Sequence, residues 1–155
     1  MNGPVKVLVV NDNSRECELV RDSLNGGDAV LTFARNAGEG LQRLARETAD
    51  ILFLDLVPPI ENGLSVLKAA VRLHPGSVTV VLSGMATLES SVDALRAGVC
   101  DYVVKPLNRE NLFHAFRRAL RAHISSRGIA QPPRRDFNPV EPPRLEFAAY
   151  SECMK

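Results

Sequence analysis

Five runs of apolar residues, rich in valine and leucine, recur along this chain, and each is followed by a polar cluster and a segment with helical spacing. The runs lie at residues 5–10, 29–33, 51–54, 78–82 and 102–104. Because they contain few polar residues, they predict strands that are covered on both faces. The alternation of strands and helices predicts an α/β fold with a doubly wound, five-stranded parallel sheet of order 2-1-3-4-5.

Amphipathic segments between the runs predict the helices that cover this sheet. The expected helices lie at residues 14–24, 38–47, 64–73, 88–98 and from 108 to about 124. Ser14 and Asn108 each stand directly before a helical stripe, and their side chains are of the kind that cap the first turn. We therefore expect Ser14 and Asn108 to be N-cap residues.

The chain changes character after residue 124. Residues 125–155 contain half of the ten prolines, and their few aromatic side chains are dispersed among charged residues. This pattern is typical of a linker or tail without its own core. The sequence thus predicts one domain at residues 1–124 and a Pro-rich tail at residues 125–155.

The overall composition excludes several classes of protein. A net charge of +1 gives no general attraction to nucleic acid or to membranes, and no apolar run is long enough to span a bilayer. The N-terminus lacks the order of a signal peptide. The three cysteines, Cys17, Cys100 and Cys153, are widely spaced, which favours free thiols over disulfides or a metal site. We expect a cytoplasmic protein.

Polar side chains stand where four of the predicted strands end. The first strand ends at Asn11-Asp12, the third at Asp55, the fourth at Ser83 and the fifth at Lys105. In open parallel sheets, ligands bind beyond the carboxyl ends of the strands, near the point where the strand order reverses. Two carboxylates, a hydroxyl and an ammonium are therefore expected at one edge of the sheet.

This set of groups suits phosphoryl transfer to a carboxylate. Mg²⁺ binds one or two carboxylates in proteins and keeps water and phosphate oxygens as its other ligands. With such an ion present, Asp55 can act as the nucleophile for a phosphoryl group, while Lys105 and Ser83 bind its oxygens. Each residue alone also has an ordinary structural explanation in a turn or loop. Their joint placement at four strand ends favours the functional interpretation.

At this point the sequence resembles the receiver domains of bacterial two-component response regulators, in particular those attached to transcriptional activators. The resemblance covers roughly residues 5–122 and implies a flavodoxin-like fold. Three segments carry it. Asp55-Leu56-Val57-Pro58-Pro59-Ile60-Glu61-Asn62-Gly63 resembles the acceptor segment, Leu82-Ser83-Gly84 the hydroxyl segment, and Ala97-Gly98-Val99-Cys100-Asp101-Tyr102-Val103-Val104-Lys105-Pro106 the segment with the switch aromatic and the Lys-Pro pair.

The resemblance implies a role for each matching residue. Asp55 would accept the phosphoryl group from a histidine kinase or phosphotransfer protein. Asp12, Asp55 and the main-chain carbonyl of Val57 would bind Mg²⁺. Ser83 and Lys105 would contact the phosphoryl group, and Tyr102 would move inward after Ser83. This movement would alter the surface formed by the fourth helix, fifth strand and fifth helix. The altered surface would control a downstream protein, and a homodimer through the same surface is a further possibility.

One position departs from the family pattern. The acidic pair that usually ends the first strand is Asn11-Asp12 here, so an amide replaces one carboxylate beside the metal. Two carboxylates remain, which is enough for Mg²⁺, and we expect the change to lower metal affinity because a neighbouring negative charge is missing.

Three alternatives remain open on the sequence alone. The amide at Asn11 is compatible with a pseudo-receiver, an interaction module that works without phosphorylation. A hydrolase with an aspartyl-phosphate intermediate would need a second acid two residues after the nucleophile, and that residue is Val57, so we expect no enzyme. A DNA-binding regulator requires that the chain be an N-terminal fragment, because no helix-turn-helix pattern follows residue 124.

Overall fold

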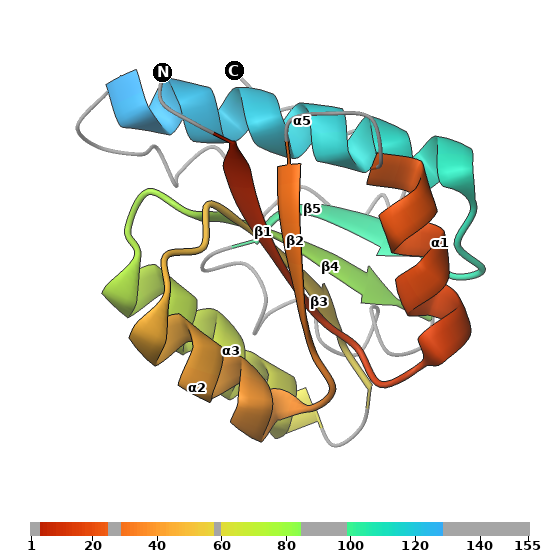
Figure 1. Ribbon diagram of the computed structural model, residues 1–155, viewed down its shortest axis with the longest axis horizontal. Helices are drawn as coiled ribbons and strands as arrows, with labels where there is room; N and C mark the ends of the chain where they lie inside the picture. Colours follow the sequence, from red (N-terminus) through yellow and green to blue (C-terminus); the bar gives the residue numbers. More distant parts are fainter. Residues whose placement is uncertain (1–3, 25–28, 58–59, 85–98, 129–155) are drawn as a thin grey trace, which may run out of the picture.

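The structure is a computed structural model that describes residues 4–24, 29–57, 60–84 and 99–128. Five parallel strands form one sheet in the order β2-β1-β3-β4-β5, which confirms the predicted topology (Figure 1). The strands are β1 (Val5–Val10), β2 (Ala29–Ala34), β3 (Ile51–Asp55), β4 (Val78–Ser83) and β5 (Val99–Val104).

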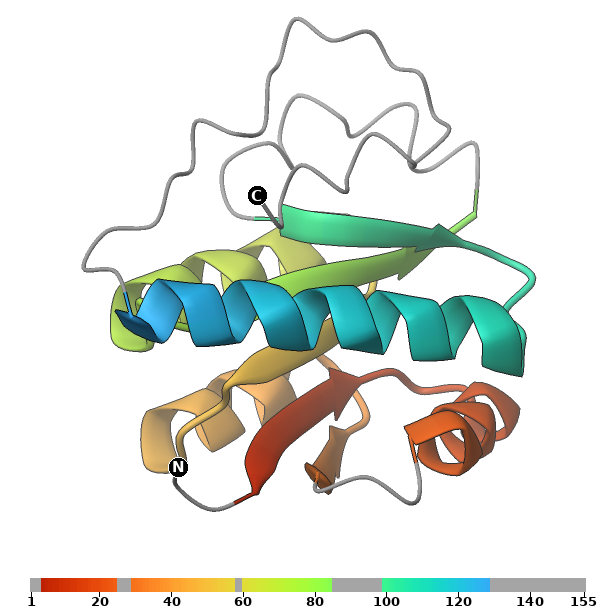
Figure 2. The same cartoon turned by 90° about the horizontal axis from the view of Figure 1, so that it is seen from above.

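Helices cover both faces of this sheet. Helices α1 (Ser14–Leu24) and α5 (Arg109–Gly128) pack together on one face, and α2 (Ala37–Arg46) and α3 (Ile60–Leu73) pack on the other (Figure 1). Seen from above, α5 lies across the sheet (Figure 2), where it contacts β3, β4 and β5. The fourth predicted helix and residues 129–155 of the predicted tail lie outside the described residues. None of the described helices is both long and apolar enough to cross a membrane.

Two helix starts differ from the sequence prediction, and a third confirms it. The cap of α1 is Asn13, not Ser14, because Asn13 Oδ1 accepts a hydrogen bond from Glu16 N at 3.0 Å. Asn108 caps α5 as predicted, with its Oδ1 accepting from Asn111 N at 2.8 Å. Helix α3 begins at Ile60, earlier than predicted, and so includes Gly63. A Cβ on Gly63 would lie 2.7 Å from Leu56 Cδ1, so this glycine serves close packing rather than a turn.

Alternation along each strand divides the core into two layers. In β1, Val7 and Val9 pack with α1 and α5, whereas Leu8 and Val10 pack with α2 and α3. In β3, Phe53 belongs to the first layer and Leu54 to the second. Because side chains alternate with a period of two, the strand register determines which helices each functional residue can reach.

A buried ion pair joins β5 to α5. Arg118 Nε lies 2.6 Å from Asp101 Oδ2, and the Asp101 side chain is 1% exposed. Burial raises the pKa of Asp101 to about 6, although Arg118 and the hydrogen bond from Tyr102 N oppose the increase. The folded state therefore binds this proton more tightly than the unfolded chain does. The resulting stabilisation of the folded state is complete at pH values below the pKa that Asp101 has in the unfolded chain. It is lost as the pH rises through about 6, the pKa of Asp101 in the folded state.

We predict that Arg118→Met lowers the free energy of unfolding by about 3 kcal/mol at pH 7, because Asp101 becomes a buried carboxylate without a cation. The loss should be smaller at pH 5, because removing Arg118 raises the pKa of Asp101 further and the neutral acid needs no cation. Urea denaturation at both pH values measures the difference. The control Arg117→Met, at an exposed position of the same helix, should change stability by less than about 0.5 kcal/mol. An equal loss at both pH values in Arg118→Met would contradict this account.

Candidate functional site

The predicted site residues meet at the carboxyl edge of the sheet. Main-chain pairing continues one residue beyond β1 and β5: Asn11 N donates to Ala34 O and Lys105 N to Ser83 O, each at 2.9 Å. The alternation of side chains therefore extends to these residues. Asn11 follows Val7 and Val9, and Lys105 follows Val103, so both face the layer of α1 and α5.

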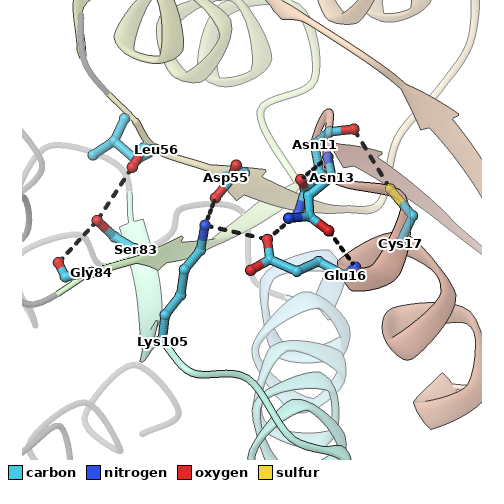
Figure 3. A network of polar contacts seen from close by, with 9 residues as sticks. All are labelled: Asn11, Asn13, Glu16, Cys17, Asp55, Leu56, Ser83, Gly84 and Lys105. Atoms are coloured by element: carbon cyan, nitrogen blue, oxygen red, sulfur yellow. Dashed lines mark hydrogen bonds and ion pairs between the residues drawn. The ribbon is translucent and has the colours of Figure 1, made fainter.

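An ion pair between Asp55 and Lys105 is the centre of this site. Lys105 Nζ lies 2.6 Å from Asp55 Oδ1, and the Asp55 side chain is only 5% exposed (Figure 3). Burial raises the pKa of Asp55, while the hydrogen bond and charge of Lys105 oppose that increase. For Lys105, burial lowers the pKa, but the neighbouring carboxylates Asp55 and Glu16 outweigh it, so its pKa is raised overall. Asp55 is thus a carboxylate held at a strand end, in contact with a cation.

Glu16 is a residue of this site that the sequence interpretation missed. Its Oε1 lies 3.2 Å from Lys105 Nζ and accepts a hydrogen bond from Asn11 Nδ2 at 3.1 Å (Figure 3). An acid in the first turn of a helix is common, because its negative charge interacts favourably with the positive end of the helix dipole. The sequence therefore gave Glu16 no distinguishing signal, and only the position of α1 beside the ends of β1 and β5 brings it to Lys105.

Asn11 is buried, with 3% of its surface exposed, and both ends of its amide have partners. Its Oδ1 accepts from Asn13 N at 2.8 Å, while its Nδ2 donates to Glu16. A main-chain N–H can only donate and a carboxylate can only accept, so these partners fix the orientation of the amide. Asn11 thus links the loop after β1 to the first turn of α1.

Ser83 and Tyr102, the two residues expected to change position on phosphorylation, are both buried. Ser83 Oγ lies 3.3 Å from the carbonyl oxygen of Leu56 and 3.2 Å from that of Gly84, so its hydroxyl is directed to the main chain (Figure 3). The Tyr102 side chain is 2% exposed and packs in the layer of α2 and α3. Tyr102 is therefore a buried residue of this layer.

A cavity of about 130 Å³ adjoins Asp55, and its lining tests whether Mg²⁺ fits. Its lining includes the expected site residues Asn11, Asp12, Asp55 and Val57, together with Arg35, Asn36 and Asn62. Within the described residues, no three Asp, Glu, His or Cys side chains are placed to bind one ion. Two carboxylates, a carbonyl and space for water do, however, match the ligands that Mg²⁺ takes from proteins. The donor set fits Mg²⁺ bound largely through water.

The fold and the site together define a doubly wound α/β protein that places carboxylates and a lysine at the carboxyl edge of its sheet. The family model of the response regulator receiver domain matches residues 7–117. The chain belongs to this family, whose general role is a phosphorylation-controlled switch. The family membership confirms the resemblance found in the sequence.

The chain is similar to curated transcriptional regulators and to solved structures that include a response regulator receiver domain. The chain is 26% identical to the transcriptional regulatory protein ZraR of Salmonella typhimurium over 85% of its own length and 30% of the relative's. It is 30% identical to the DNA-binding transcriptional regulator NtrC of Escherichia coli, over 74% of this chain and 24% of NtrC. It spans about a third or less of these relatives' length.

Among solved structures, a CheY-like receiver domain from Methanospirillum hungatei has a TM-score of 0.70 and 27% identity, covering 80% of this chain and 99% of that one. NtrX from Brucella abortus, solved in complex with ADP, has a TM-score of 0.72 and 26% identity, covering 82% of this chain and 29% of NtrX. The chain is thus similar both to an isolated receiver domain and to part of a longer protein.

We predict that Lys105→Met lowers the free energy of unfolding by about 2 kcal/mol at pH 7.5, because it leaves the buried Asp55 carboxylate without its cation. Removing Lys105 also removes the interaction that restrains the pKa of Asp55, so this pKa should rise further. The loss should therefore narrow as the pH falls and Asp55 takes up a proton. Chemical denaturation across pH 5 to 7.5 measures it, with the exposed Lys68→Met as the control. A loss that does not vary with pH would show that Lys105 stabilises the fold independently of Asp55.

Proposed function

We propose that this chain is a signalling switch that accepts a phosphoryl group on Asp55 from the phosphohistidine of a histidine kinase or phosphotransfer protein. The observation that carries the proposal is the 2.6 Å ion pair between Asp55 and Lys105 beside a cavity lined by Asp12. A buried carboxylate with a fixed cation and an open face is suited to nucleophilic attack on phosphorus. We further propose that the protein works in the cytoplasm, in keeping with its predicted free thiols.

The chemistry of the step follows from the neighbours of Asp55. A carboxylate oxygen of Asp55 forms the bond to phosphorus, and the bond from phosphorus to the histidine nitrogen breaks with its electron pair remaining on that nitrogen. Lys105 stays within reach of the new phosphoryl oxygens and offsets their negative charge. Asp12, Asp55 and the carbonyl of Val57 would hold Mg²⁺, which supplies neutralisation of phosphoryl charge when bound.

Ser83 would transmit the change to the rest of the fold. Its hydroxyl hydrogen-bonds the main-chain carbonyls of Gly84 and of Leu56, the residue that follows Asp55. Rotation of the Ser83 side chain would redirect the hydroxyl to a phosphoryl oxygen. Tyr102 lies in the neighbouring strand β5, paired with Val81 of β4, so a shift at the end of β4 would reach it directly. We propose that the resulting change of the surface around β5 and α5 controls a downstream protein.

The similarity to ZraR and NtrC extends the proposal to the output. Both are regulators of transcription by their names, and the chain matches only part of each. We propose that the receiver controls a transcriptional output, either as part of a longer regulator or through a partner protein.

We predict that acetyl phosphate with Mg²⁺ adds one phosphoryl group to the protein and that Asp55→Asn abolishes the addition. Intact-mass spectrometry measures the added mass, and omission of Mg²⁺ should suppress it. Asp22→Asn, an exposed acid on α1, is the matched control and should be labelled like the wild type. Labelling that persists in Asp55→Asn would refute the assignment, and a wild type without labelling would favour the pseudo-receiver that works without phosphorylation.

A further inference from the structure

Lys105 contacts two carboxylates, those of Asp55 and Glu16. Its Nζ is 2.6 Å from Asp55 Oδ1 and 3.2 Å from Glu16 Oε1, and its side chain is 24% exposed. The Glu16 side chain is 19% exposed, so both ends of this second ion pair are largely withdrawn from water. Charge pairs in such surroundings are screened less than pairs on the surface. Glu16 therefore acts on Lys105 at close range.

The amide of Asn11 makes this position of Glu16 possible. Asn11 Nδ2 donates to the same oxygen, Glu16 Oε1, that contacts Lys105 (Figure 3). A carboxylate at position 11 would instead bring two negative oxygens to the 3.1 Å contact now made by the amide. Like charges at this distance repel strongly. Asn11 and Glu16 are therefore matched, since an amide at position 11 suits a carboxylate at position 16.

The charges of the site support the same conclusion. Asp12 and Asp55 are the carboxylates that line the cavity, and Lys105 cancels one of their two charges. Glu16 adds a further negative charge next to Lys105 without lining the cavity itself. It thus offers the ammonium a partner other than Asp55, which leaves the Asp55 carboxylate freer to bind a cation.

We infer that Glu16 is a positioning residue for this site: it supplies the negative charge missing at position 11 and shares Lys105 with Asp55. The inference rests on the proposed function, in which Asp55 binds Mg²⁺ and accepts the phosphoryl group. Glu16 acts through Lys105 and is not itself a ligand of the ion. Without its charge, Lys105 pairs with Asp55 alone and competes more strongly with Mg²⁺.

Mg²⁺ binding to the unphosphorylated chain provides the first test, because it requires no phosphoryl donor. Glu16→Gln keeps the shape of the side chain and an oxygen that accepts from Asn11, and it removes only the charge. Its dissociation constant for Mg²⁺, measured by calorimetry, should rise about tenfold, the size found for groups that act behind metal ligands. Glu18→Gln, at an exposed position of α1, is the matched control and should bind like the wild type.

Moving the charge provides a decisive second variant. In Asn11→Asp/Glu16→Gln the carboxylate and the amide exchange places, so the contact between positions 11 and 16 is kept. The dissociation constant for Mg²⁺ should return to within about threefold of the wild-type value, because charge and not side-chain shape is restored. The inference is overturned if Glu16→Gln binds Mg²⁺ as the wild type does, or if the double variant binds no better than Glu16→Gln.

A measurement without metal separates this inference from the proposed function. In the wild type, two carboxylates hold the Lys105 ammonium, so its protons should exchange slowly with water. The ¹⁵N NMR signal of this ammonium should therefore be sharp. Glu16→Gln should broaden that signal, whereas Glu18→Gln should leave it unchanged. An unchanged Lys105 signal in Glu16→Gln overturns the inference. Failure of the wild type to bind Mg²⁺ or accept a phosphoryl group counts against the proposed function and leaves the NMR comparison to decide the role of Glu16.

Discussion

The contact between Asp55 and Lys105 connects two strands that are not neighbours, since β4 lies between β3 and β5. It can form only because parallel strands end at a common edge, where a long lysine side chain can reach past the end of the intervening strand. Most side chains in the two layers that cover the sheet are apolar, and burying a charge among them is costly unless it is paired. The packing of the core thus brings the reactive groups of the site together.

The same alternation that fills the core determines which helix takes part in the site. Asn11 and Lys105 face the layer of α1 and α5, and Glu16 in the first turn of α1 contacts both. The site is therefore divided between two sides. Asp12 lines the cavity on the side of α2 and α3, and Glu16 holds Lys105 on the side of α1. One side offers oxygen ligands to a cation, and the other contacts the lysine.

Much of this arrangement could be predicted from the sequence, and the part that could not has a clear cause. Strand order, the strand-end positions of Asp55 and Lys105, and the cap at Asn108 follow from local patterns of apolar and polar residues. Glu16 and Arg118 resemble ordinary charged residues of exposed helix faces, and only the packing of their helices against the sheet reveals their partners. The earlier start of α3 has a similar cause, because Gly63 lies inside the helix and allows its close approach to Leu56. Contacts between distant segments depend on tertiary packing, which local sequence patterns do not encode.

If Asp55 accepts a phosphoryl group as proposed, the carboxyl edge of the sheet must bind a phosphoryl mimic at this residue. The most direct measurement is an NMR titration of the unphosphorylated protein with beryllofluoride, which binds to carboxylates as a mimic of the phosphoryl group, in the presence of Mg²⁺. We expect the protein to bind one equivalent, with the largest amide shifts at Asp55, Ser83 and Lys105, and Asp55→Asn to bind none. Shifts centred elsewhere, or an equal response in Asp55→Asn, would contradict it.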